Sequence, residues 1–185
     1  MKRRKFIAVL GTATATGSTA LYLGTRPSEG ASAELGSLDV PDIDTSTSGD
    51  SIESITLTVD SNYEYDSSHN PDSWTLELLV GDNEDTMQPI DSVTETESLL
   101  QSDSGTETLS GSITSTYHFS TMDFEPSNGG EVSRPVWVAL RFQLTANGEI
   151  VAEETITENV SVTVDGASLE ASASVGGSGE IQIET

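Results

Sequence analysis

The chain has 185 residues, of which 31 are Asp or Glu and 7 are Lys or Arg, so its formal net charge at pH 7 is −24. From residue 34 onward there are 30 acids and only two bases, Arg134 and Arg141, which leaves 2 − 30 = −28 for that part. Nucleic acids and anionic lipids are bound through Lys and Arg, so this charge excludes them as partners. The chain has no cysteine, which excludes disulfides, thiol catalysis and thiolate metal sites.

The acidic residues are scattered along the chain, and no lysine follows Lys5. Hydrophobic residues make up 34% of the chain and recur in alternating runs, which a disordered acidic tail does not need. This composition resembles that of proteins from extremely halophilic archaea, although it names no family. The resemblance implies that the protein works in molar salt, where charges act over only about 3 Å and self-repulsion is tolerable.

The amino terminus carries a basic head, since residues 2–7 read Lys-Arg-Arg-Lys-Phe-Ile, followed by a long uncharged and weakly apolar segment. This pattern resembles a twin-arginine export signal. Arg3 and Arg4 match the paired arginines of such a signal. Phe6 and Ile7 match the hydrophobic step that follows the pair. The resemblance implies that the folded protein is exported by the twin-arginine route to the cell surface or the medium.

Ala31, Ser32 and Ala33 are the small residues that a signal peptidase reads. We therefore expect cleavage after Ala33, with a signal peptide over residues 1–33. The alternative is a retained anchor, because the roughly 19 uncharged residues behind the basic head would span about 28 Å as a helix. A membrane contact is expected only through such an uncleaved helix.

The rest of the chain divides by composition into three parts. Residues 34–50 are rich in Ser, Thr and Asp, which suits an acidic spacer or an edge strand. Residues 51–175 contain short runs in which apolar and polar residues alternate, separated by turn signals such as Asn147-Gly148. Residues 176–185 contain a Gly-rich joint and then a short alternating segment.

The alternating runs predict about eight strands and no sustained helical period. The run over 108–120 predicts one bent strand or two short ones, with Tyr117 and Phe119 facing inward and His118 on the exposed polar face. Residues 86–105 are too irregular to assign, and a short helix is an alternative there. We therefore expect an all-β fold, an antiparallel β-sandwich of immunoglobulin-like or jelly-roll-like kind. The clearest runs cover residues 54–59, 74–80, 136–144 and 160–164.

The sequence offers little catalytic or metal-binding chemistry. A chain with two histidines, His69 and His118, and no cysteine makes a poor zinc site. No serine has the Gly-x-Ser-x-Gly setting of a nucleophile. Asp82 with Glu84 or Asp85 offers a carboxylate pair for calcium or acid-base chemistry, but so acidic a chain produces such pairs by chance. A solvated acidic surface is the simpler interpretation, and we expect no cofactor.

Two local features bear on a role outside the cell. Tyr63 and Tyr65, together with Trp74 or Trp137, suggest either an aromatic platform for a sugar or ordinary core packing, and core packing is the simpler interpretation. The triplet that begins at Asn159 reads Asn-Val-Ser, a glycosylation acceptor on a chain with an export signal.

These observations favour an exported, salt-adapted cell-surface or extracellular β-sandwich protein with a structural, adhesive or binding role. One alternative is a secreted hydrolase that uses carboxylates. Another is a filament or particle subunit in which Ile181 and Ile183 complete a neighbour's sheet by strand exchange, although pairing within the same chain is simpler. The expected partners are copies of the chain itself or other envelope proteins.

Overall fold

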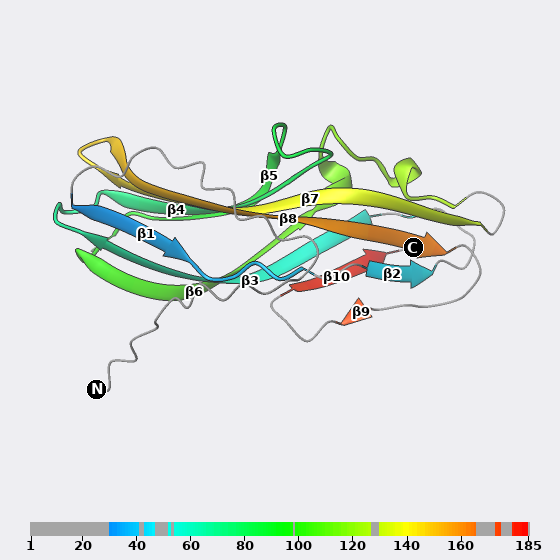
Figure 1. The fold of residues 1–185 in the computed structure, drawn as a ribbon, viewed down its shortest axis with the longest axis horizontal. Helices are drawn as coiled ribbons and strands as arrows, with labels where there is room; N and C mark the ends of the chain where they lie inside the picture. Colours follow the sequence, from blue (N-terminus) through cyan, green and yellow to red (C-terminus); the bar gives the residue numbers. More distant parts are fainter. Residues whose placement is uncertain are drawn as a thin grey trace, which may run out of the picture.

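The computed structural model describes residues 30–40, 43–46, 52, 54–97, 99–126, 130–165, 173–174 and 179–184. These residues form two β-sheets packed face to face, so the predicted all-β sandwich is confirmed (Figure 1). Two short 3-10 turns, η1 and η2, lie between β6 and β7. The elements are β1 (Ala31–Leu35), β2 (Ile43–Ser46), β3 (Ser54–Ser67), β4 (Ser73–Gly81), β5 (Gln88–Glu95), β6 (Ser102–Ser112), η1 (Ile113–Ser115), η2 (Thr121–Asp123), β7 (Glu131–Ala146), β8 (Glu149–Asp165), β9 (Ala173–Ser174) and β10 (Gly179–Glu184).

The first sheet is built around β3, which pairs with β6 on one side and shares its other side between β1 and β10. The second sheet has the order β2-β8-β7-β4-β5, and its pairs are antiparallel except for the parallel edge pair of β2 with β8. Within the described strands, the chain crosses between the sheets six times, after β1, β2, β3, β5, β6 and β8. Among the longer strands and β1, the order is therefore β1-β3-β6 facing β5-β4-β7-β8.

The core lies between the sheets and follows the two-residue period of the sequence. Tyr63 and Trp74 have ring centroids 4.7 Å apart, and Tyr63 and Phe142 have centroids 5.3 Å apart. Burial raises the pKa of the Tyr63 hydroxyl to about 12, helped by the nearby negative charge of Asp103 and Glu107. Tyr63, Tyr65 and Trp74 are therefore core residues and form no surface platform, and burying each large side chain stabilises the fold by roughly 1.5–3 kcal/mol.

The region expected as a spacer contributes strands instead, which is the edge-strand alternative. β1 pairs with the end of β3, and its first residue, Ala31, is buried. The end of β1 and the segment after it are tied to β8, because the Leu35 N–H donates to the carboxylate of Glu154 and the Val40 N–H donates to Glu158 at 2.7 Å. The folded domain therefore begins before residue 34 in the described chain.

The predicted strand over 108–120 is wrong in its second half. β6 ends at Ser112, and η1 follows at once. At Gly111 a Cβ would lie 2.4 Å from the carbonyl oxygen of Ile90, so only glycine lets β6 pass this close to β5. Because the turn breaks the alternation, Tyr117 is exposed and the His118 side chain is buried, the reverse of the prediction. Residues 86–105, left unassigned from the sequence, contain β5.

Candidate functional site

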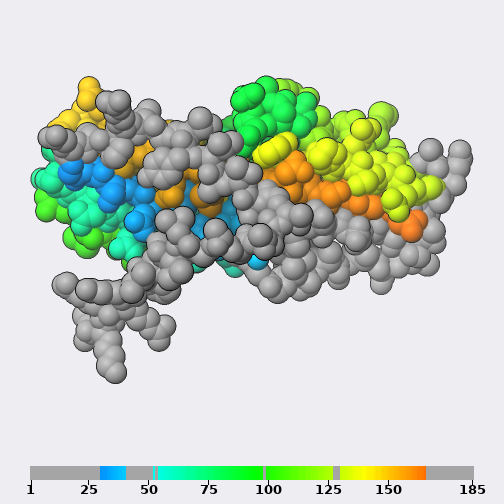
Figure 2. All heavy atoms as spheres, in the orientation of Figure 1, coloured from blue at the N-terminus to red at the C-terminus, as the bar shows by residue number. Residues whose placement is uncertain are grey.

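The two loops that carry the most distinctive side chains meet where β4 ends, beside the middle of β7 (Figure 1). The β4–β5 loop, residues 82–87, leaves the sheet after Gly81, and the described part of the β6–β7 connection, residues 113–126, passes beside it. Figure 2 shows these segments, coloured green and yellow-green, as neighbouring bulges on the surface. Loops that a rigid sandwich holds in place are common sites of recognition, so these two loops form the candidate site.

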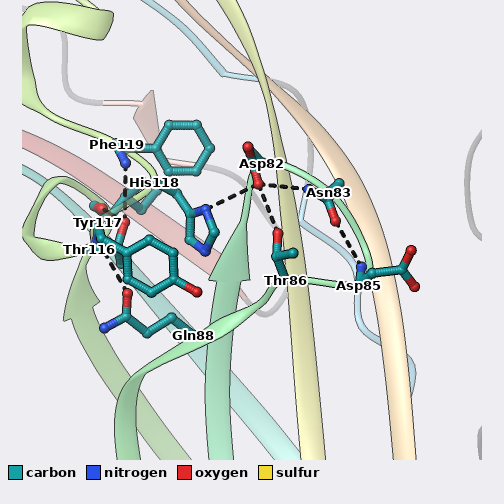
Figure 3. Close-up of polar contacts among 10 residues, drawn as sticks. Asp82, Asn83, Asp85, Thr86, Gln88, Thr116, Tyr117, His118 and Phe119 are labelled. Atoms are coloured by element: carbon teal, nitrogen blue, oxygen red, sulfur yellow. Dashed lines mark hydrogen bonds and ion pairs between the residues drawn. The ribbon is translucent and has the colours of Figure 1, made fainter.

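His118 is held in the candidate site by Asp82. The His118 Nδ1 lies 3.1 Å from the Asp82 Oδ1, and only 7% of the His118 side chain is exposed. The same Asp82 oxygen accepts hydrogen bonds from Thr86 Oγ1 and Asn83 Nδ2, both at 2.9 Å (Figure 3). These bonds fix the carboxylate in the loop, and the carboxylate in turn fixes the imidazole.

The other nitrogen of this histidine, His118 Nε2, is buried and has no hydrogen-bond partner among the described residues. Leaving a buried polar atom unpaired costs about 1–3 kcal/mol, so such an atom is uncommon in a protein interior. The imidazole lies between Asp82 and Tyr117 (Figure 3), which places this unpaired atom within the same cluster. The cluster therefore has unused hydrogen-bonding capacity.

Tyr117 covers the buried histidine and faces solvent. Its ring centroid lies 3.9 Å from that of His118, and 74% of the residue is exposed. Its backbone N–H donates to Gln88 Oε1 at 3.3 Å, which links the connection to the start of β5. Below it, Phe119 and Phe124 are buried with ring centroids 5.6 Å apart. A large aromatic ring is thus presented to solvent on a packed and hydrogen-bonded base.

Carboxylates in the β4–β5 loop point to different partners. Asp82 holds His118, whereas Glu84 accepts a hydrogen bond from Thr157 Oγ1 at 3.1 Å on the outer face of β8. Asp85 is exposed, and its backbone N–H donates to Asn83. The pairs suggested by the sequence therefore form no shared carboxylate site. In the described part of the chain, no group of three His, Asp or Glu residues is placed to hold a metal ion.

Glu154 is the carboxyl group that bears on the hydrolase alternative. Burial raises its pKa, the charge of Glu34 raises it further, and the hydrogen bond from the Leu35 N–H opposes both effects. A raised pKa in a cleft would suit a general acid. This carboxylate instead accepts the backbone N–H of Leu35, the last residue of β1, so its role is structural.

Comparisons with protein-family models, with curated proteins and with solved structures found no match. Within the described residues, no helix has the length and apolar character needed to cross a membrane. The support for a function therefore comes from the residues and the geometry of the candidate site.

The sequence-predicted site residues are not brought together. Arg3, Arg4, Phe6 and Ile7 lie outside the described residues. Ala31, Ser32 and Ala33, the expected cleavage region, lie within β1 and pair with residues 65–67 of β3. Asn159 is exposed on β8, opposite Trp137 of β7. In β10, Ile181 pairs with Leu57 and Ile183 with Ile55, both in β3 of the same chain.

Sequence reasoning considered Asp82 and His118 separately and missed the cluster that they form with Tyr117. A signal was available in the residues after Gly111, which include hydroxyl side chains that stabilise turns. Thr116 Oγ1 donates to the Ile113 carbonyl and accepts from the Phe119 N–H, which holds the turn beneath Tyr117. If the alternation is taken to break at this point, the sequence predicts that His118 faces inward.

Proposed function

We propose that this protein is an exported, salt-adapted, non-enzymatic binding module of the cell surface or extracellular space. The observation that supports a binding role is the exposed ring of Tyr117, supported from below by the Asp82–His118 pair. A rigid aromatic side chain loses little conformational entropy when a ligand covers it, which makes it an effective anchor for binding.

The charge of the chain supports the salt-adapted part of the proposal. The two cations in the described residues are both engaged, since Arg134 Nε donates to the Asp123 carbonyl and Arg141 Nε donates to Glu77. The many remaining carboxylates repel one another unless dissolved salt screens them. Export by the twin-arginine route fits the same conditions, because a protein of this charge would complete its folding in concentrated salt before transport.

Fractionation of producing cells tests the proposal. We expect the wild-type chain in the envelope or medium, and the double variant Arg3→Lys, Arg4→Lys retained inside. Purified wild-type protein should bind envelopes of the same cells in molar KCl, and Tyr117→Ala should bind at least tenfold more weakly. Tyr117→Phe keeps the ring and is the matched control. Wild-type protein that stays in the cytoplasm, or that does not bind the envelope, would contradict the proposal.

A second candidate is a subunit assembled by strand exchange. It is supported by the complete antiparallel register of β10 on β3, which a neighbour's β10 could reproduce residue for residue. The same register serves pairing within one chain, so the oligomeric state in solution separates the two.

A further inference from the structure

We infer that Asn147 is a site of spontaneous deamidation, and that Asp72 slows this reaction by holding the backbone N–H of Gly148. Asn147 and Gly148 are the two residues of the turn between β7 and β8, at one end of the ribbon in Figure 1. The reaction belongs to the chain itself and needs no ligand, so it is independent of the proposed binding role.

The turn leaves the Asn147 side chain open to water. Asn147 has a φ of 55° and Gly148 a φ of 76°, so both lie in the left-handed region, as in a type I′ hairpin turn. Both residues are exposed, and a Cβ added at Gly148 would meet no atom within 4 Å. Neither burial nor a neighbouring side chain therefore shields the amide of Asn147.

The reaction requires these two residues and water alone. The backbone nitrogen of Gly148 attacks Cγ of the Asn147 side chain, and the new C–N bond closes a five-membered succinimide. The bond between Cγ and Nδ2 breaks, and the amide group leaves as ammonia with the proton that the Gly148 nitrogen gives up. Water then opens the succinimide at either carbonyl, which yields aspartate or isoaspartate at position 147. Glycine favours the first step because it places no side chain beside the attacking nitrogen.

Asp72 binds the nitrogen that would attack. The Gly148 N–H donates to Asp72 Oδ2 at 2.9 Å, a contact between residues 76 positions apart. The Asp72 N–H in turn donates to the carbonyl of Thr145 at 2.7 Å, which fixes Asp72 beside the hairpin. Hydrogen bonds to a charged acceptor are strong, and a carboxylate also opposes the loss of a proton from the group beside it. The bond to Asp72 must therefore break before the nitrogen can reach the Asn147 side chain.

Deamidation would weaken the hairpin that contains the turn. Either product replaces a neutral amide by a carboxylate next to Glu149 and Asp72, and these like charges repel. Isoaspartate also carries the chain through its Cβ, so the turn gains a backbone atom and no longer fits the pairing of Ala146 with Glu149. β7 and β8 are the two longest strands of the described chain, so the change acts on a main pairing of the second sheet.

The experiment incubates the full chain in warm, mildly alkaline molar KCl and follows deamidation by mass spectrometry. Cleavage after Glu131 and Glu149 separates the fragment that contains Asn147 from the chain's other Asn-Gly pair, at residues 128–129. We expect Asn147 in the folded wild-type chain to react about tenfold more slowly than in the same chain unfolded in urea. Asp72→Ala should react about fivefold faster than the folded wild type, because it removes one hydrogen bond to a charged group.

Two further variants separate the bond from a general loosening of the turn. Asp72→Asn keeps an acceptor oxygen for the Gly148 N–H, so its rate should stay closer to that of the wild type than to that of Asp72→Ala. Asn70→Ala is the matched control, because Asn70 lies in the same β3–β4 turn but accepts from Gln101 Nε2 at 3.3 Å. This control should leave the rate at Asn147 unchanged.

Each result decides one part of the inference. An Asn147 fragment that stays unmodified even in urea would overturn the site. Equal rates in the folded and the unfolded wild-type chain, or in the wild type and Asp72→Ala, would overturn the protection by Asp72. An acceleration by Asn70→Ala as large as that by Asp72→Ala would also overturn it, since loosening of the turn would then explain both.

Discussion

The carboxylate of Glu158 on β8 accepts a hydrogen bond from the backbone N–H of Val40 at 2.7 Å, a contact between residues 118 positions apart. With the similar bond from the Leu35 N–H to Glu154, it fastens the end of β1 and the segment after it to β8. β1 itself pairs with β3, so the amino-terminal part of the described chain links both sheets.

The first prediction concerns the position of export processing. A chain that begins at Glu34 loses three of the five pairs between β1 and β3, together with the buried Ala31. We expect it to be less stable than a chain beginning at Gly30 by about 1–3 kcal/mol, from lost hydrogen bonds and apolar burial. Urea unfolding in molar KCl measures the difference.

The sequence of the exported protein's amino terminus completes this test. Cleavage upstream of Gly30 would keep β1 and agree with the measured stability. A mature chain that begins at Glu34 and is as stable as the longer one would show that β1 contributes nothing, contrary to this prediction.

The second prediction concerns the close approach of β6 to β5. In Gly111→Ala the new Cβ would lie 2.4 Å from the Ile90 carbonyl oxygen, which is backbone and cannot rotate away. We expect a loss of about 1–3 kcal/mol, in the range of other overpacking substitutions. Ser102→Ala, at an exposed position of the same strand, is the control and should change stability by less than about 0.5 kcal/mol. Equal stability of both variants would refute the crowding at Gly111.

How far the sequence predicts the structure depends on whether local pattern or long-range contact decides each element. The alternating runs of β3, β4 and β7 have one apolar face each, so the sandwich and its core followed directly. β5 carries Pro89 and pairs along one side only, and such edge strands lack a strong pattern. The contact between His118 and Asp82 joins two loops that are distant along the chain, and no local pattern reports it.

The third prediction concerns the pH dependence of stability through Glu154. Burial raises the pKa of this carboxyl in the folded state, so the folded state holds its proton more tightly than the unfolded chain does. The stabilising contribution of the protonated carboxyl is therefore fully present below the pKa that Glu154 has in the unfolded chain. It is lost as the pH rises through the pKa of the folded state. Glu154→Gln keeps an acceptor for the Leu35 N–H and removes this loss. We expect a gain at pH 7 of less than about 1 kcal/mol, because the group is only half buried.

Asp123 provides a control of opposite sign. Hydrogen bonds from the Ser120 N–H and hydroxyl, and the charge of Arg134, lower the pKa of this carboxyl. Its stabilising contribution is present above the unfolded value and is lost as the pH falls through the folded one, so Asp123→Asn should be less stable at neutral pH. Thermal unfolding of both variants from pH 3 to pH 8 measures the two trends, and parallel curves would contradict both.

The fourth prediction concerns salt. Lowering KCl from molar to tens of millimolar lengthens the screening distance from about 3 Å to 10 Å or more, so carboxylates across the surface repel one another. We expect the β-sheet circular dichroism to be lost, and to return in part at mildly acidic pH. The same spectrum and melting temperature at both salt concentrations would exclude salt adaptation.

The last prediction concerns β10 and the open side of β3. Within the chain, Gly179–Glu184 pairs with residues 54–59 of β3, beside the stretch that β1 covers. Removing residues 176–185 should leave one edge of that part of β3 unpaired, while β6 still pairs with its other edge, and an unpaired strand edge recruits other chains. We therefore expect light scattering in molar KCl to show a monomer for the full chain and larger species for the truncated one. Strand exchange between copies predicts the reverse, with assemblies of the full chain that disappear on truncation. Because the two arrangements use the same register on β3, mass in solution distinguishes them where the pairing itself does not.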